Sequence, residues 1–127
     1  PLGIESCNVY DILISAFCLE TAARDAEEWK GFVARISAML KPGGVLLLVS
    51  VEDSVAYRVG HRYFSNVCIN EGMLKETLSS CGYAVDSILV HRVKAQNPFW
   101  SKYQGFLMSS AQKAPRDNVS ISLPAQE

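Results

Sequence analysis

The sequence Leu40-Lys-Pro-Gly-Gly-Val-Leu-Leu-Leu-Val-Ser-Val51 joins a helix stop signal to an aliphatic run. Pro42 cannot continue a helix and Gly43-Gly44 permits positive φ angles, so we expect a turn here. The run at 45–51 predicts a buried strand, and it is far shorter than the roughly 20 apolar residues that cross a bilayer. The glycines follow a helix and precede a strand, the reverse of the order in phosphate-binding loops, so we interpret them only as a turn.

A strand and a helix are predicted before this turn. Residues 9–16, Val-Tyr-Asp-Ile-Leu-Ile-Ser-Ala, are nearly all apolar, which predicts a strand covered on both faces. Asp25 and Glu28 have the spacing of a capping box at the start of a helix. Strand, helix and strand together predict a right-handed βαβ unit with a parallel sheet at its centre. One helical stripe holds the apolar residues of this helix: Ala26, Trp29, Phe32, Val33, Ile36, Met39 and Leu40.

A second helix and two more strands are predicted after residues 52–68, a connection rich in aromatic and charged residues. Asn70 is a suitable N-cap and Gly82 a suitable stop for the helix. Strands are expected at 83–93 and 105–111, and the short connection at 94–104, with a turn at Asn97-Pro98, makes this last pair antiparallel. The fold class is therefore α/β. Three residues form the apolar stripe of the helix: Leu74, Leu78 and Cys81.

The composition is that of one globular domain. The chain has 127 residues, of which 49% are hydrophobic, and its formal net charge is -1. We expect the domain at 1–113 and a flexible tail at 114–127, which carries at most a short edge strand. The 12 Lys and Arg residues against 13 Asp and Glu residues disfavour a protein that binds nucleic acid or an anionic membrane surface.

The sequence predicts neither disulfides nor a metal site. The histidines His61 and His91 are too isolated in sequence to form a metal site. We interpret Cys18 as a small buried residue rather than a nucleophile, and the absence of a secretory signal predicts a cytoplasmic protein. Because the chain begins at Pro1 rather than Met, we expect it to be processed or truncated. No Cys-x-x-Cys pair occurs, so free thiols are expected at Cys7, Cys18, Cys68 and Cys81.

The carboxyl ends of the first two predicted strands are the expected ligand site, because open parallel sheets bind ligands there. The loop after the first strand carries Phe17 and Glu20, and the loop after the second carries Glu52, Asp53 and Ser54. An aromatic ring and as many as three carboxylates on one rim suit an amine or a positively charged ring. The alternative is that Glu20 and Glu52 are solvated loop acids.

Aromatic residues in the 52–68 connection offer a second candidate feature. Tyr57, Tyr63 and Phe64 lie close together in sequence. Their rings would form a wall over the crevice at the strand ends, although core packing explains each of them equally well.

Several separated motifs resemble one family, the class I S-adenosylmethionine-dependent methyltransferases. The resemblance runs from Pro1 to Lys113 and is closest to the group of nicotinamide, phenylethanolamine and indolethylamine N-methyltransferases. It implies a Rossmann-like methyltransferase fold, mostly parallel with an antiparallel last strand. Five stretches carry the resemblance: the turn at 40–44, Asp11-Ile-Leu-Ile-Ser-Ala-Phe-Cys-Leu-Glu20, Tyr57-Arg-Val-Gly60, Phe64-Ser65, and Gly105-Phe-Leu107 leading to Ala111-Gln-Lys113.

The resemblance also implies roles for individual residues. Ser15, Ala16 and Phe17 would line the crevice on the side of the cofactor S-adenosylmethionine and of the methyl acceptor. Glu20 matches the acidic residue that faces the acceptor, where it would anchor the nitrogen or receive its proton. Tyr57 matches an aromatic residue of the acceptor pocket.

Two positions differ from the amine-binding members of the family. Those members carry acids where this chain has Ser54 and Ser101, which disfavours a catecholamine as the acceptor, although Asp53 offers a neighbouring carboxylate. The expected acceptor is therefore a small aromatic or heteroaromatic amine. Its nitrogen would displace the methyl group in line, with no metal or covalent intermediate.

Only the carboxyl-terminal half of such an enzyme is recognised in the sequence. The family's glycine-rich loop, ribose-binding acid and amino-terminal lid have no counterpart, so we expect the chain to need the missing half of the fold or another protomer. One alternative is a non-catalytic, truncated module that acts through protein association. A second is a flavodoxin-like receiver domain, which would need a pair of amino-terminal acids and a strand-end Asp that this sequence lacks.

Overall fold

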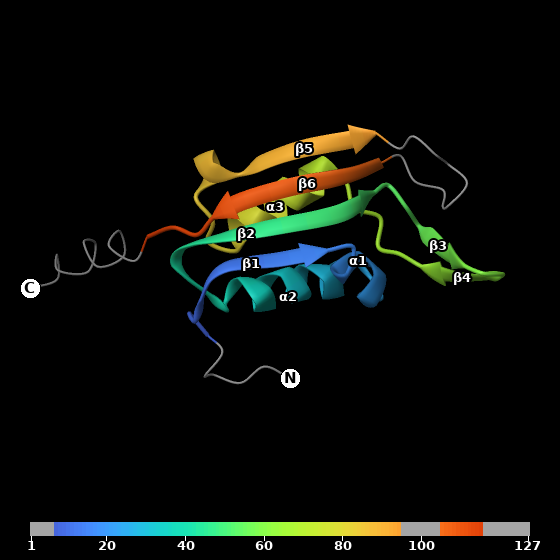
Figure 1. The fold of residues 1–127 in the computed structure, drawn as a ribbon, viewed down its shortest axis with the longest axis horizontal. Coiled ribbons are helices and arrows are strands. Elements are labelled where there is room, and N and C mark those ends of the chain that lie inside the picture. The colour runs from blue at the N-terminus through green and yellow to red at the C-terminus, as the bar shows by residue number, and fades with distance from the viewer. Residues whose placement is uncertain (1–6, 95–104, 116–127) are drawn as a thin grey trace, which may run out of the picture.

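A computed structural model describes residues 7–94 and 105–115 and shows a four-stranded sheet with two longer helices on one face (Figure 1). In chain order the elements are β1 (Tyr10–Ala16), α1 (Leu19–Ala22), α2 (Ala26–Ser37), β2 (Leu40–Glu52), β3 (Ala56–Val59), β4 (Arg62–Ser65), α3 (Glu71–Ser80), the short 3₁₀ helix η2 (Val85–Ser87), β5 (Leu89–Lys94) and β6 (Gly105–Gln112).

The strand order of the sheet is β1-β2-β6-β5. β1 pairs with β2 in parallel, whereas β6 pairs with both β2 and β5 in antiparallel. β1, β2 and β5 therefore run in one direction and β6 alone opposes them. This confirms the expected α/β class, the parallel pair and the antiparallel last strand.

Helix α2 begins as predicted and ends earlier than predicted. The Asp25 side chain accepts a hydrogen bond from the Glu28 backbone N–H (2.8 Å), while the Glu28 carboxylate turns to Arg24. The helix ends at Ser37 rather than at Leu40, because Leu40 pairs with Tyr10 as the first residue of β2. The turn at residues 40–44 is therefore a distorted start of β2, where the register with β1 shifts.

Two further boundaries differ from the predictions. The strand expected at 83–93 begins only at Leu89, after η2. The connection at 52–68 contains the unpredicted hairpin β3–β4, whose turn is made by Gly60 and His61. Helix α3 agrees with the prediction, including the Asn70 cap that accepts from the Met73 N–H (2.8 Å). The turn expected at 97–98 and most of the tail expected at 114–127 lie outside the described residues.

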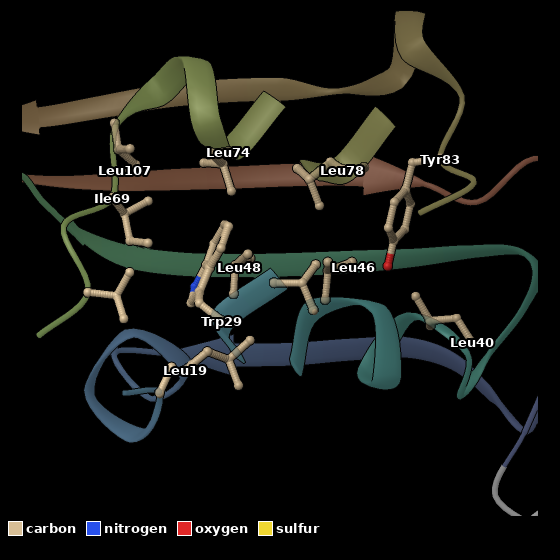
Figure 2. Packing of buried hydrophobic residues seen from close by; sticks show 14 residues of the cluster. Leu19, Trp29, Leu40, Leu46, Leu48, Ile69, Leu74, Leu78, Tyr83 and Leu107 are labelled. Atoms are coloured by element: carbon tan, nitrogen blue, oxygen red, sulfur yellow. The ribbon is translucent and has the colours of Figure 1, made fainter. Parts of the chain in front are cut away.

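The core lies between the sheet and the helices α2 and α3 (Figure 2). Trp29 is fully buried among leucine side chains from α3 and from β2. At the other end of α2, the Tyr83 hydroxyl donates a hydrogen bond to Ser37 Oγ (2.6 Å), which in turn donates to the Val33 carbonyl (2.7 Å). Other fully buried members of the core are Val33, Leu40, Leu46, Leu48, Ile69, Leu74, Leu78 and Leu107.

The prediction that the first strand is covered on both faces is wrong. Ile12 and Ile14 are 62% and 67% exposed. β1 is an edge strand of the described sheet, and no described helix covers the face to which these side chains point. We call this the bare face of the sheet; its large exposed side chains are Tyr10, Ile12, Ile14, Leu47, Leu89 and Met108.

Candidate functional site

Two residues in the left-handed region follow the carboxyl ends of the parallel strands β1 and β2. Phe17 has φ 55° and Asp53 has φ 53°, conformations that are unusual for residues other than glycine. Backbone hydrogen bonds hold both turns, from the Phe17 N–H to the Val49 carbonyl and from the Asp53 N–H to the Ile69 carbonyl (2.9 Å each). Strained backbone of this kind is concentrated at functional sites.

The loop after β1 presents an apolar surface. The Phe17 ring is half-exposed and packs edge-on against Phe106, with 5.5 Å between ring centroids. Ala16 is exposed, while Ser15 is half-buried and pairs with Leu48 in the β1–β2 ladder. Of the three residues expected on the cofactor side, Ala16 and Phe17 are therefore accessible at the strand end.

Glu20 lies in α1, and its side chain is bonded to the end of β2. Its side chain is fully buried, and Oε2 accepts a hydrogen bond from the Val51 N–H (2.7 Å). The Glu20 carbonyl accepts from the Val67 N–H (2.9 Å), whereas Oε1 is buried without a partner among the described residues. Burial raises the pKa of this carboxyl more than the hydrogen bond from Val51 lowers it. The alternative of a solvated loop acid is wrong for Glu20.

Glu52 is buried as well, at 2% exposure. Its Oε2 forms an ion pair with Arg92 Nη2 of β5 (2.6 Å), and Oε1 has no partner in the described part of the chain. The same guanidinium lies 4.0 Å from Glu71 at the start of α3. Glu52 is therefore not a solvated loop acid either.

Asp53 and Ser54 have different environments although they are neighbours. Asp53 is exposed, and its Oδ1 accepts a weak hydrogen bond from the Cys68 thiol (3.9 Å). Burial, together with the negative charge of Asp53, raises the pKa of Cys68. Ser54 is buried, donates to the Ala56 carbonyl (2.9 Å) and accepts from Asn66 (3.2 Å), so its hydroxyl fastens the base of the hairpin.

The predicted aromatic residues lie on the β3–β4 hairpin, which projects from the carboxyl end of β2 (Figure 1). Tyr57 and Phe64 stack across the two strands with 5.4 Å between centroids and 25° between ring planes. Tyr63 is 65% exposed. None of these rings is a buried core residue, so core packing does not explain them.

The cysteines offer no structural site among the described residues. Cys18 is exposed at the start of α1, so its interpretation as a buried residue is wrong. The four thiols are free, as predicted, and no group of His, Cys, Asp and Glu residues that could hold a metal occurs in the described ranges. No helix within those ranges is long and apolar enough to cross a membrane.

Sequence reasoning missed two cations at the same end of the sheet. Arg92 and Lys94 on β5 line an open hollow of about 510 Å³ together with Glu52 and Asp53. Their alternation along the strand was a signal that they share a face. Glu52 and Arg92 lie far apart in sequence, so the sequence did not indicate that they are in contact.

The profile of the NNMT/PNMT/TEMT family matches residues 1–114. Nicotinamide N-methyltransferase from Sus scrofa is 30% identical over 86 residues, which cover 68% of this chain and 33% of that protein. Phenylethanolamine N-methyltransferase from Mus musculus is 33% identical over 97 residues, which cover 75% of this chain and 33% of that protein. The chain thus spans about a third of the length of these curated relatives.

Solved structures resemble the fold at lower sequence identity. A SAM-dependent methyltransferase from Methanosarcina mazei has a TM-score of 0.64 at 19% identity, covering 86% of this chain and 61% of that one. The 1,6-didemethyltoxoflavin-N1-methyltransferase of Burkholderia thailandensis has a TM-score of 0.58 at 19% identity, covering 85% and 45%. The expected Rossmann-like methyltransferase fold is therefore confirmed.

Proposed function

Because the chain belongs to the NNMT/PNMT/TEMT family, we propose that it forms the acceptor side of an enzyme that transfers a methyl group from S-adenosylmethionine to the nitrogen of a small aromatic or heteroaromatic amine. The observation that carries this proposal is the pair of left-handed turns at Phe17 and Asp53. They lie at the carboxyl ends of neighbouring parallel strands, where open α/β sheets bind ligands.

The acceptor would be held by aromatic faces and carboxylates. Phe17 and Tyr57 offer flat faces to a ring, and exposed Asp53 offers a carboxylate to a positively charged group. The buried Oε1 of Glu20 lacks a hydrogen-bond donor among the described residues, and the N–H of a bound acceptor would supply one. In this role Glu20 orients the nitrogen or receives its proton.

The cofactor supplies an electrophilic methyl group when it is bound. In the described residues, only the edge formed by Ser15, Ala16 and Phe17 fits part of it, because the half-exposed ring of Phe17 offers a π face to a sulfonium. These residues would exclude water and align the two reactants, and such alignment lowers a barrier by up to roughly 7–11 kcal/mol. The remaining cofactor contacts would come from the rest of the fold.

The position of Ser54 argues against a catecholamine acceptor. Its hydroxyl is already bonded to Ala56 and Asn66 and is buried, so this position offers no charge to an alkylammonium. Each missing charge-assisted contact weakens the binding of a cation. The second position that differs, Ser101, lies outside the described residues.

The bare face supports the proposal that the amino-terminal half of the methyltransferase fold covers this sheet. Apolar side chains of β1, β2 and β6 form the face, and β1 has an unpaired edge in the described sheet. The same surface favours a second candidate function, a non-catalytic module that associates with another protomer. Sedimentation of the purified chain separates the two, because a module forms one defined oligomer.

A competition assay with the longer enzyme tests the acceptor class. Nicotinamide, quinoline, tryptamine and phenylethanolamine are supplied together at equal concentration with S-adenosylmethionine, and the methylated products are counted by mass spectrometry. We expect a ring nitrogen, that of nicotinamide or quinoline, to be methylated first. A clear preference for phenylethanolamine would contradict the acceptor class and leave the family unaffected.

A further inference from the structure

The hollow beside Glu52 has a floor without a side chain. In the sheet, Gly105 of β6 pairs with Glu52 of β2 on one side and with Lys94 of β5 on the other. The three residues form one row, and a Cβ at Gly105 would overlap the carbonyl oxygen of Val93. The backbone of β5 therefore fills the space beside Gly105, and only glycine fits between the acid and the base of this row.

The side chain of Arg92 reaches across β6 to β2. Arg92 pairs with Leu107 in the next row of the ladder, and its guanidinium reaches Glu52 on the far side of β6. Every described residue that lines the hollow is charged: Glu52, Asp53, Arg92 and Lys94. Two charges of each sign in one hollow suit a ligand that itself carries both signs.

The charges in the hollow are only partly satisfied. Glu52 Oε2 is paired with Arg92, but Glu52 Oε1 is buried without a donor in the described ranges. In those ranges no acid lies within ion-pair distance of Lys94, which is exposed. An unpaired buried acceptor is costly, so a bound ligand that donates a hydrogen bond there stabilises the site.

We propose that this hollow binds the zwitterionic α-amino acid group of an aromatic acceptor. The ammonium faces Glu52 Oε1 and Asp53, and the carboxylate faces Arg92 and Lys94. The proposal rests on the proposed function for the identity of the ligand as the methyl acceptor. It narrows the acceptor class to aromatic amines that carry a carboxylate.

Binding to the 127-residue chain tests the charge pattern without any catalytic step. The ¹⁵N-labelled chain is titrated in separate NMR experiments with three ligands that share an indole ring. Tryptophan carries both charges, tryptamine only the positive charge and indole-3-propionate only the negative charge. We expect tryptophan to bind tightest, by about fivefold over either single-charge ligand, the effect of one exposed ion pair. Equal affinities for the three ligands, or no binding, would overturn the proposal.

A variant of Lys94 tests whether this residue binds the carboxylate of the ligand. Lys94→Gln should weaken tryptophan and indole-3-propionate about fivefold and leave tryptamine unchanged. Lys41→Gln is the matched control, since Lys41 pairs with Asp11 of β1 and does not line the hollow. If Lys94→Gln weakens all three ligands equally, the carboxylate does not bind at Lys94 and the proposal is wrong.

A further titration with methionine distinguishes the acceptor from the cofactor, because S-adenosylmethionine carries the same α-amino acid group. Tighter binding of tryptophan than of methionine places the group on an aromatic ligand, and tighter methionine binding would overturn that assignment. Failure of the proposed function has a different signature. In that case tryptophan binds to the chain, but the longer enzyme methylates no aromatic amine.

Discussion

The Glu20 carboxylate accepts a hydrogen bond from the Val51 N–H over 2.7 Å, although the two residues are 31 positions apart in the chain. This contact fastens α1 to the carboxyl end of β2, just before the left-handed turn at Asp53. One residue therefore couples the loops that follow both parallel strands. Its substitution should affect ligand chemistry and the pH dependence of stability in different ways.

In the longer enzyme, Glu20→Gln should impair turnover of an amine or pyridine acceptor more than it affects folding. The amide retains an oxygen for the Val51 N–H but loses a charge next to the proposed acceptor nitrogen. The loss in kcat/KM should correspond to roughly 1.5–3 kcal/mol. Steady-state kinetics and thermal unfolding measure the two effects, with exposed Glu27→Gln as the control. Unchanged kinetics together with unchanged stability would remove Glu20 from the site.

The same substitution should change how stability depends on pH. Burial raises the pKa of Glu20 above the ordinary value of 4.5, so the folded state holds its proton more tightly than the unfolded state. The stabilisation is complete below pH 4.5 and is lost as the pH rises through the folded pKa. Wild type should therefore gain stability relative to Glu20→Gln on acidification from pH 8 to 4.5. Urea unfolding at several pH values checks this, and a constant difference would contradict it.

Tyr83 should control stability at alkaline pH. Burial raises its pKa from 10.0 to about 12, against the opposing effect of the hydrogen bond with Ser37. The folded state keeps the phenol protonated while the unfolded state releases the proton, so stability falls between pH 10 and 12, by at most about 3 kcal/mol. Tyr83→Phe should remove this loss, whereas Tyr10→Phe at an exposed position should not. Urea unfolding midpoints are measured between pH 10 and 12. If they fall equally with pH in Tyr83→Phe and Tyr10→Phe, the loss of stability does not come from Tyr83.

Substitutions on the two faces of the sheet should affect different properties, self-association for the bare face and stability for the helix-covered face. Ile14→Lys on the bare face should reduce self-association of the purified chain and hardly change its free energy of unfolding, because Ile14 is 67% exposed. Leu48→Ala on the helix-covered face should cost about 2–5 kcal/mol, because Leu48 is buried. Analytical ultracentrifugation and urea unfolding give the two readouts. A large destabilisation by Ile14→Lys would show that the bare face is covered.

The purified 127-residue chain should bind S-adenosylmethionine weakly or not at all. Its described residues offer the cofactor only the edge at Ser15, Ala16 and Phe17. Titration calorimetry checks the prediction, with S-adenosylhomocysteine as a second ligand. Saturable micromolar binding would mean that this chain alone builds a cofactor site.

The local signals in the sequence predicted most elements, because the forces behind them are local. The Asp25 and Asn70 caps and the positive φ of Gly82 act within one helical turn, and these helix limits were correct or close. The β3–β4 hairpin was missed because its strands are four residues each and its Gly60-His61 turn is not a strong hairpin signal.

The candidate site was predictable in position but not in detail. Strand ends identified Phe17, Glu20 and Asp53, since chain direction alone places these loops at one edge. The burial of Glu20 and of Glu52 depends on partners far along the chain, the Val51 N–H and the Arg92 guanidinium. Apolar periodicity indicates which surfaces prefer to be buried and cannot indicate what covers them, which is why the exposure of β1 was not foreseen.

The position of β6 has a consequence for synthesis of the protein. It is the last strand in the described chain, yet it lies between β2 and β5 in the sheet. Until Gly105–Gln112 has emerged from the ribosome, β2 and β5 lack the strand that joins them. Both strands then present open apolar edges, which are prone to pairing with other chains. The sheet thus closes only after β6 has emerged, and the chain is most exposed to wrong strand pairing in the interval before that.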